Sequence, residues 1–592
     1  MKSKIITIFT LAILLLQTSC NMDENLYTPA LDGFVNDSVD VSYLVNGVYS
    51  GLCSNGLYKK EAANMGLYGH DVFAVVNANY LEFPLRTVVA ADSKLGSLWT
   101  GYYKVIKDAN LLIDELSKVG DHIKPDYKER IIGEMRFLRA FCYYDLVRTF
   151  GEVPIRTNKT TVYGGDFYLP ASSIDDVYMQ IFDDLKAAET TCWPASKQPV
   201  NEKGRANTGA AKAMTASAAL AYANHLEMPN DRTLTPDPAK AKQYYKMAYE
   251  YADSVISSGE YSLLDDYAAL FSVAGEAIAY REVIFAIQFA ADTKASSASS
   301  RGSEFAYYTQ PSTRFNVCGN VTNKKGSPVI KIQPWFYDLC TTGDYGAGTA
   351  NGIVKDVDYR SQTNFLTMWP FEDTGIIQRI TYPRLKAVET AANPGMIIDI
   401  NSSDLYPYLN KYTDPEGMQS LNNGNDFYIF RLAEMYLIKA EALNEYNDRP
   451  TQEAYDALEK VRERARKKSG NIYPLKIEAS AGLSKEDFRM KIWDERGLEF
   501  LGEPKRHFDA VRMRYKDNQR TMIEYIYDDF YVNMSADLKK DIRYNASGDF
   551  YETGRVYVNG VGKFNRKFLI WPIPASEKEA NPNMTQNPDY GW

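Results

Sequence analysis

Apolar residues recur at intervals of three and four positions through most of the chain, and this spacing restricts the fold more than any other feature of the sequence. It predicts amphipathic helices at residues 41–52, 98–116, 134–155, 210–223, 239–259, 426–447 and 492–502. Gly151 and Gly259 mark two helix ends, and short Gly, Asn or Pro breaks join the helices in pairs. The sequence therefore predicts an all-α fold of tetratricopeptide-like helical hairpins, in degenerate form because no strict repeat is present.

Length and composition predict several regions instead of one core. A chain of 592 residues exceeds the roughly 250 to 300 at which single cores stop growing. Between residues 290 and 425 the helical spacing gives way to Ser, Gly, Asn and Thr with scattered aromatics, which is typical of a functional region. A few short strands are expected, among them 282–289 and a hairpin around Asn559-Gly560. The predicted regions are a signal peptide (1–19), an acylated tether (20–40), an N-terminal helical region (41–289), an irregular loop-rich ligand-binding subdomain (290–425) and a C-terminal helical region with a terminal hairpin and tail (426–592).

The start of the chain has the features of a secretory signal. Lys2 and Lys4 precede an apolar run at residues 5–16, which is too short to span a bilayer because a spanning helix needs ~20 apolar residues. Two small residues then lead into Cys20, and this resembles a bacterial lipobox, although Gln17 stands where that pattern prefers Leu. We therefore expect Cys20 to be lipidated and to anchor the protein to a membrane; the alternative is an ordinary signal peptide with an incidental cysteine.

Charge and cysteine content exclude several classes of protein. The net charge is −9, or −11 once Lys2 and Lys4 leave with the signal, which argues against a nucleic-acid partner. The 44 Tyr, 26 Phe and 7 Trp suit sugar rings and peptides, but they also suit wet helix interfaces. The further cysteines are Cys53, Cys142, Cys192, Cys318 and Cys340. Their odd number excludes a complete disulfide framework, and the absence of CxxC spacing disfavours a zinc site. A disulfide between Cys318 and Cys340 stays open.

Five segments in fixed order carry a more specific signal: LWTGYYKVIKDAN (98–110), EMRFLRAFCYYDLVRTFGEVPI (134–155), FRLAEMYLIKAEALNE (430–445), DERGLEFLGEPKRHFDAVRM (494–513) and IPASEKEANPNMTQNPDY (573–590). Together with the lipobox they resemble the SusD/RagB family of Bacteroidetes outer-membrane nutrient-binding lipoproteins. Glu503-Pro504-Lys505-Arg506 departs from the usual Glu-Gly-x-Arg of that family.

This resemblance implies a helical scaffold of degenerate tetratricopeptide pairs with an irregular subdomain packed on it. It also implies a surface-exposed lipoprotein of the outer membrane that acts as a lid over a TonB-dependent transporter of the SusC type. Such a protein captures an oligosaccharide, or in some members a peptide, and delivers it to the transporter without catalysing a reaction and without a cofactor.

Three glutamates suggest a catalytic function as an alternative to sugar capture. Glu495, Glu499 and Glu503 lie four residues apart and share one helix face if the helix continues, and paired carboxylates are what glycoside hydrolysis needs. Arginines interleave with them, so the alternative is a network of ion pairs. The chain has no GxSxG and no HExxH, and its four histidines lack ligand spacing. Asp344, Asp356 and Asp358 in the irregular region are possible ligands of a structural calcium ion, although their spacing fits no calcium-binding loop.

Two loop clusters are the candidate binding site. A sugar stacks its C–H face on an aromatic ring while polar side chains bind its hydroxyls, so a site needs both kinds of residue. The alternative is that these aromatics simply cover loop backbone. We expect Trp99 to lie in the core and Trp335, Phe336 and Tyr337 to be half buried. The candidate ligand-binding residues are Asp71, Phe73, Asn79, Tyr80, Phe83 and Arg86 in the first cluster, and Phe305, Tyr307, Tyr308 and Arg314 in the second.

Overall fold

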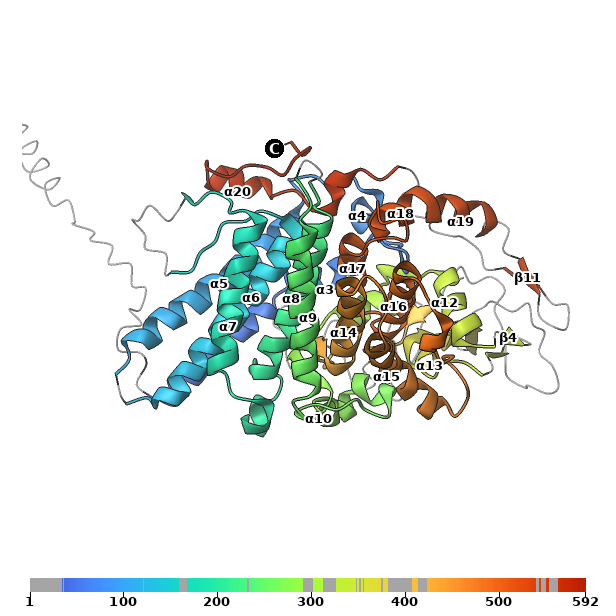
Figure 1. The fold of residues 1–592 in the computed structure, drawn as a ribbon, viewed down its shortest axis with the longest axis horizontal. Coiled ribbons are helices and arrows are strands. Elements are labelled where there is room, and N and C mark those ends of the chain that lie inside the picture. Colours follow the sequence, from blue (N-terminus) through green and yellow to red (C-terminus); the bar gives the residue numbers. More distant parts are fainter. Residues whose placement is uncertain are drawn as a thin grey trace, which may run out of the picture.

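The computed structural model (Figure 1) is mainly helical. It describes residue 35 and residues 37–591, apart from 121, 159–167, 232–233, 291–301, 312–325, 348, 351–352, 355, 374–375, 382–406, 414–422, 539–541, 545–549 and 553–562. The predicted signal peptide, Cys20 and the predicted hairpin around Asn559-Gly560 lie outside the described residues. Among the helices that are described, none combines the length and the apolar character needed to cross a membrane.

The N-terminal half is a stack of antiparallel helical hairpins, as the periodicity predicts. Each long helix packs on its neighbour in sequence, from α5 on α6 through to α8 on α9 (Figure 1). Helix α6 ends at Gly151 as predicted, whereas α9 ends three residues before Gly259. The bounds are α2 (Ser38–Leu52), α5 (Ser93–Lys118), α6 (Pro125–Phe150), α7 (Ile174–Thr191), α8 (Thr208–Glu227) and α9 (Pro238–Ile256).

The C-terminal half continues the stack, because α14 packs on α9 and then on α15 and α16. The two halves share one cluster of buried apolar residues, in which Trp99 is 3% exposed, as expected. Trp335 is half-buried as expected, whereas Phe336 and Tyr337 are fully packed in the core and that part of the prediction is wrong. A π-helical turn, η9, separates α18 from α19. The bounds are α14 (Leu432–Tyr446), α15 (Gln452–Ser469), α16 (Lys485–Glu499), α17 (Arg506–Arg512), α18 (Met522–Tyr525), η9 (Ile526–Phe530), α19 (Tyr531–Leu538) and α20 (Ala575–Ala580).

The predicted helix at 426–447 is wrong in its first turn. Residues Phe427–Arg431 form strand β10, which pairs antiparallel with β2 (Val283–Ile287), the strand expected at 282–289. All residues of both strands are buried. The aromatic and β-branched side chains of FYIF fit such a two-sided environment, and the helix begins only at Leu432.

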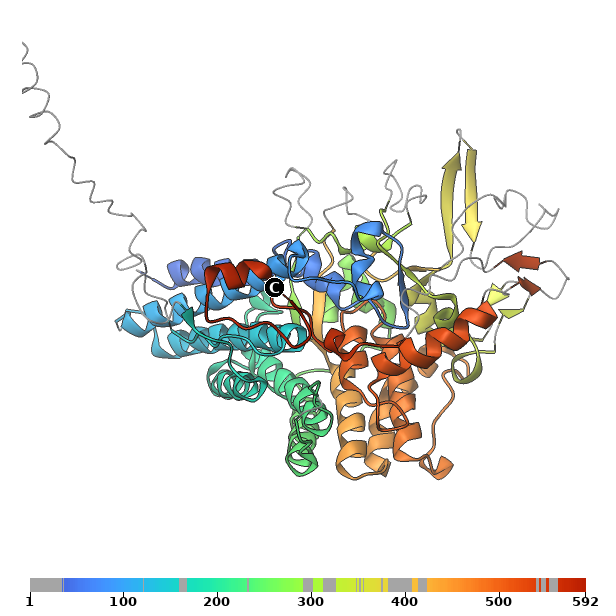
Figure 2. The same cartoon turned by 90° about the horizontal axis from the view of Figure 1, so that it is seen from above.

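Short strands and turns build the face from which the loops project (Figure 2). The strands form two-stranded antiparallel pairs: β1 (Phe73–Val75) with β3 (Ile330–Ile332), β4 (Thr349–Ala350) with β5 (Ile353–Val354), β6 (Phe365–Leu366) with β9 (Tyr408–Leu409), β7 (Met368–Asp373) with β8 (Ile376–Thr381), and β11 (Ile542–Tyr544) with β12 (Phe550–Glu552). The β7–β8 hairpin extends furthest from this face in Figure 2.

Short helices connect these elements. The α-helical ones are α3 (Glu61–Met65), α4 (Glu82–Leu85), α10 (Glu276–Ala279), α11 (Phe305–Thr309), α12 (Pro334–Thr341) and α13 (Arg360–Asn364). The 3-10 turns are η1 (Ala78–Tyr80), η3 (Ala195–Lys197), η4 (Val200–Glu202), η5 (Tyr267–Phe271), η6 (Val273–Gly275), η7 (Gly343–Tyr345), η8 (Ala479–Ala481) and η10 (Arg566–Leu569). Helices α4 and α11 carry four of the ten candidate binding residues: Phe83, Phe305, Tyr307 and Tyr308.

Candidate functional site

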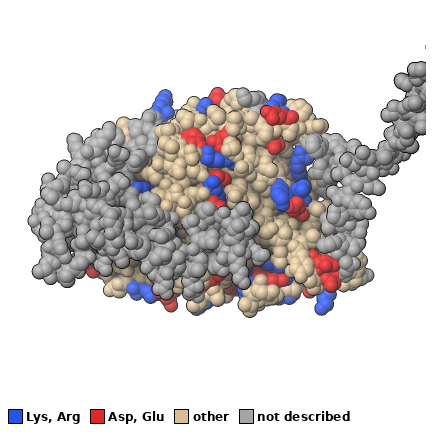
Figure 3. Space-filling view, turned by 180° about the vertical axis from the view of Figure 1, so that it is seen from behind, with Lys and Arg blue, Asp and Glu red and all other residues tan. Residues whose placement is uncertain are grey.

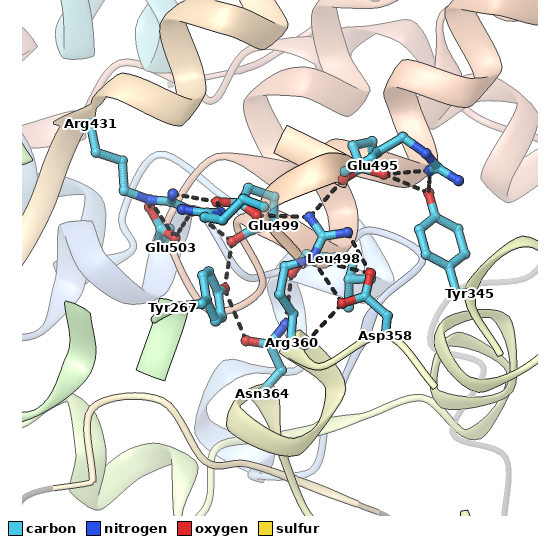
Figure 4. Close-up of polar contacts among 12 residues, drawn as sticks. Tyr267, Tyr345, Asp358, Arg360, Asn364, Arg431, Glu495, Leu498, Glu499 and Glu503 are labelled. Carbon is cyan, nitrogen blue, oxygen red and sulfur yellow. Dashed lines mark hydrogen bonds and ion pairs between the residues drawn. The ribbon is translucent and has the colours of Figure 1, made fainter. Parts of the chain in front are cut away.

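The three glutamates that suggested catalysis lie in a buried network of ion pairs (Figure 4). Helix α16 ends at Glu499, so Glu503 is not on the helix; it follows in the next turn and still reaches the same cluster. The innermost ion pairs are Arg360 with Asp358, Glu495 and Glu499; Arg431 with Glu282, Glu499 and Glu503; Arg462 with Glu495; Arg464 with Glu282 and Glu499; and Lys411 with Glu503.

The arginines keep these carboxylates ionised. Burial alone would raise the pKa of Glu499, but Arg464, Arg431 and Arg360 hold it well below its ordinary value. The pKa of Glu495 is likewise lowered by Arg360 and Arg462 against the effect of burial. A glycosidase needs one carboxylic acid that is protonated and able to donate its proton. This network stabilises the opposite state, and its side chains are shielded from solvent, so it holds the scaffold together.

Two of the three possible calcium ligands, Asp344 and Asp358, form ion pairs. Asp358 pairs with Arg360 at 2.6 Å, and Asp344 pairs with Lys491 at 2.5 Å. Within the described ranges, no three His, Cys, Asp or Glu side chains gather as metal ligands. Cys340 is a free, buried thiol, and Cys318, its possible partner, lies outside the described residues.

The two predicted loop clusters meet in space. The backbone N–H of Val76 donates to the carbonyl of Val329, and the N–H of Val329 donates to the carbonyl of Tyr308, both at 2.8 Å. Together with the pairing of β1 and β3, these bonds hold the first cluster beside α11, which carries the second. Figure 3, turned by 180° from the view of Figure 1, shows this face of the molecule, with a small group of basic and acidic side chains near its middle.

Lys60 joins the aromatic side chains of the two clusters. Its ammonium group lies 5.9 Å from the ring centroid of Tyr80 and 5.5 Å from that of Tyr308. On the other side, the ammonium of Lys94 lies 5.1 Å from the Tyr80 ring. Tyr307 packs edge-on against Tyr308, with centroids 5.2 Å apart, and both tyrosines are half-buried. The result is a group of aromatic rings with cationic side chains beside them, in which Tyr307 and Tyr308 are partly accessible and Tyr80 is buried.

Four residues of the first cluster are fully packed inside the protein. Asp71 accepts two hydrogen bonds from the Arg506 guanidinium, at 3.0 and 2.7 Å, and Phe73 lies in strand β1. Phe83 packs edge-on against Trp571, with centroids 5.4 Å apart. The Arg86 guanidinium is surrounded by the rings of Tyr527, Phe564 and Trp571. These four side chains contact other parts of the protein and do not face solvent.

The remaining candidates include both exposed and buried residues. Asn79 is exposed, and Tyr80 is 6% exposed with its ring between the two lysines. In the second cluster, Phe305 is buried against Tyr412 and Phe427. Arg314 lies outside the described residues. The structure therefore brings together Asn79, Tyr80, Tyr307 and Tyr308, and places Phe305 in the core.

Several site residues were missed by the sequence analysis. Lys60, Glu61 and Asn64 lie in and beside α3, and Tyr68 follows α3 by three residues. Lys94, at the start of α5, completes the group. The stretch KKEAANMGLY does place Glu61 and Asn64 three positions apart, on one face of a helix. A five-residue helix is too short to give a recognisable period, so this signal was weak.

The fold and this site define a helical-repeat protein of the tetratricopeptide-like kind, with an aromatic and charged face built by its loops. Comparison with known families gives a more specific result. Residues 281–592 match the sequence model of the SusD family, and residues 28–220 match one described as starch-binding associating with outer membrane. The first match covers more than half of the chain. The chain belongs to the SusD family, which confirms the resemblance found in the sequence.

Similar proteins extend over most of the chain. A SusD-like protein of Formosa agariphila is 26% identical over 507 residues, covering 82% of this chain and 84% of its own. A SusD homolog from Bacteroides thetaiotaomicron has the same fold, with a TM-score of 0.71 at 20% identity over 94% of this chain and 98% of its own. Surface glycan-binding protein A from Bacteroides uniformis matches with a TM-score of 0.63 at 19% identity, covering 92% and 98%.

Proposed function

We propose that this protein captures oligosaccharides at the cell surface. The observation that carries the proposal is the meeting of Tyr80, Tyr307 and Tyr308 around Lys60, because aromatic rings beside charged hydrogen-bonding groups suit the two faces of a sugar. Membership of the SusD family supports it, and so does the fold shared with a protein named for glycan binding.

In this proposal the glycan is bound without being cleaved, since the carboxylates of α16 are held in ion pairs. Lipid on Cys20 holds the protein in the outer membrane at the cell surface. A TonB-dependent transporter of the SusC type receives the oligosaccharide as the protein closes over it. A description of one matching family as associating with the outer membrane supports this location.

A binding screen with product analysis tests the proposal. The full-length chain, purified in mild detergent, is titrated by calorimetry with neutral and acidic oligosaccharides and with peptides, and every bound compound is recovered and analysed. We expect an oligosaccharide to bind and to be recovered intact. Tyr80→Ala and Tyr308→Ala should weaken binding at least tenfold, because stacking on an aromatic ring is lost. Tyr43→Ala is the matched control, since Tyr43 on α2 is 69% exposed.

Three outcomes would contradict the proposal. Recovery of a cleaved oligosaccharide, with cleavage abolished in Glu495→Gln, would establish a glycoside hydrolase. Binding of peptides alone would establish the peptide-binding alternative within the same family. Purification of the native lipidated protein from membranes without any transporter barrel would remove the proposed partner.

A further inference from the structure

Three buried polar atoms near the tyrosines have no hydrogen-bond partner among the described residues. They are Oε2 of Glu61, Nδ2 of Asn64 and the hydroxyl of Tyr68. The three residues are 8%, 1% and 1% exposed. A buried polar atom without a partner costs ~1–3 kcal/mol, and nearly all such atoms in folded proteins are paired with protein, water or ligand. Three of them together therefore indicate a place where a polar molecule binds.

These atoms lie near the aromatic group described above. Glu61 and Asn64 share one face of α3, since they are three residues apart. The Tyr68 ring packs against Tyr80, with centroids 5.5 Å apart. The carboxylate of Glu61 is close enough to raise the pKa of the Tyr68 hydroxyl, after burial and Tyr80. Tyr68 therefore lies against Tyr80 and Glu61 against Lys60, and we call Glu61, Asn64 and Tyr68 the floor of the candidate site.

Lys60 lies between this floor and solvent. Its side chain is 25% exposed, and its ammonium group lies 3.2 Å from the Glu61 carboxylate. A lysine side chain has a long flexible stem, so it can move aside while its charged end stays in water. A ligand group can therefore reach Glu61 without any movement of the backbone.

The charges of the site fit a neutral ligand. Lys60 pairs with Glu61, and Lys94 pairs with Glu82 at 2.5 Å and with Asp92 at 3.5 Å. Lys59 lies 4.0 Å from Glu304. In this group four carboxylates surround three ammonium groups, so each cation already has a carboxylate beside it. An anionic ligand would meet a site whose summed charge is negative.

We propose that this site takes an uncharged oligosaccharide and that Glu61, Asn64 and Tyr68 bind its hydroxyl groups. One hydroxyl donates to Glu61 Oε2, another accepts from Asn64 Nδ2, and the Tyr68 hydroxyl donates or accepts as the sugar requires. The ring of that sugar packs against Tyr80 and Tyr308. The inference rests on the proposed function, and it adds the charge class of the ligand and the residues that recognise it.

The first test compares neutral and anionic sugars on the unmodified full-length chain. The neutral probes are maltohexaose, laminarihexaose, xylohexaose and mannohexaose; the anionic probes are hexamannuronate, hexagalacturonate and a heparin hexasaccharide. Mannohexaose and hexamannuronate form a matched pair, because they share the same linkage and differ in a carboxylate on each ring. We expect the tightest binder to be neutral, and at least tenfold tighter than any anionic probe. An anionic tightest binder would overturn the inference and leave the proposed function standing.

The second test uses variants that preserve shape. Glu61→Gln should weaken the tightest neutral probe at least tenfold and Tyr68→Phe about fivefold, with melting temperatures near that of the parent protein. Tyr245→Phe is the matched control, because Tyr245 is 0% exposed and its hydroxyl donates to Glu227 in the helical scaffold. Unchanged binding in both site variants would overturn the inference alone. Failure of every sugar to bind would overturn the inference and the proposed function together.

Discussion

Replacement of Glu499 by Gln tests whether the buried ion network holds the scaffold together. The innermost network contains five cations, Arg360, Lys411, Arg431, Arg462 and Arg464, and five carboxylates, Glu282, Asp358, Glu495, Glu499 and Glu503. Their side chains are 0 to 4% exposed. With all ten side chains ionised the charges balance, and Glu499→Gln leaves one buried positive charge without compensation. Burial lowers the pKa of Lys411 to about 7, so the comparison is made at about pH 6, where Lys411 is protonated.

The expected loss follows from the geometry of Glu499. Its Oε1 accepts from Arg431 and Arg464, and its Oε2 accepts from Arg360 Nη1 at 2.7 Å. In glutamine one of these oxygens becomes an amide NH₂, which cannot accept a hydrogen bond. Placing this NH₂ at the position of Oε2 costs less, because it then faces one arginine, Arg360, and not two. Breaking a buried ion pair by removing one partner costs ~3–5 kcal/mol. We therefore expect the free energy of unfolding to fall by that amount, with the overall fold retained.

Urea unfolding followed by helical circular dichroism measures this loss. Glu463→Gln is the matched control, because Glu463 pairs with Lys467 on the surface, where their side chains are 42% and 70% exposed; it should cost less than ~1 kcal/mol. Arg464→Gln added to Glu499→Gln restores charge balance, so the double variant should lose less than the sum of the single losses. A loss below about 1 kcal/mol for Glu499→Gln would refute the reasoning.

Further predictions concern neighbouring parts of the structure. Gly66→Ala should lower the melting temperature, because a Cβ there would lie 2.4 to 2.7 Å from atoms of Pro504, whereas Gly47→Ala, with open space around it, should be neutral or stabilising by differential scanning calorimetry. Burial alone would raise the pKa of Asp71, but Arg506 lowers it to about 2; the stability that this shift provides is present above pH ~4 and is lost as the pH falls towards 2. The difference in urea stability between the parent protein and Asp71→Asn should therefore be about 2 kcal/mol or more at pH 7 and smaller at pH 3, and an equal difference at both would contradict this. Glu503→Gln should weaken sugar binding more than Glu495→Gln does, when calorimetry compares variants of similar stability, because Glu503 directly precedes the turn that contacts α3.

The helical scaffold was predictable because its signal is local. The end of α6 at Gly151, where φ is 76°, and the burial of Trp99 both follow from patterns within a few turns of helix. Strand β10 was not predictable in the same way, because a short apolar run such as FYIF suits a buried helix or a strand equally. Its partner β2 decides between the two, and β2 lies about 140 residues earlier in the chain.

The arrangement of the candidate residues was predictable only in part, for the same reason. Tyr80 and Tyr308 were recognised as loop aromatics, but only the pairing of β1 with β3 brings them together around Lys60. Phe83 and Arg86 have the same local character as Tyr80, yet Trp571 from the C-terminal region packs against both and removes them from the surface. Whether a loop aromatic contacts ligand or protein thus depends on a segment almost five hundred residues away.

The buried network and the loop face are connected through one turn. Glu503, the last carboxylate of the network, is followed directly by Pro504, which packs on Gly66 at the end of α3. The N–H of His507 donates to the carbonyl of the same glycine at 3.2 Å. Glu61 and Asn64 lie three residues apart on α3, while Ala62 and Met65 line a partly open pocket of about 110 Å³. Because Pro504 replaces the glycine usual at this position in the family, it adds a rigid contact where α3 ends. The ion network is therefore connected to the end of α3, beside the proposed binding site, and the departure from the family motif falls at this contact.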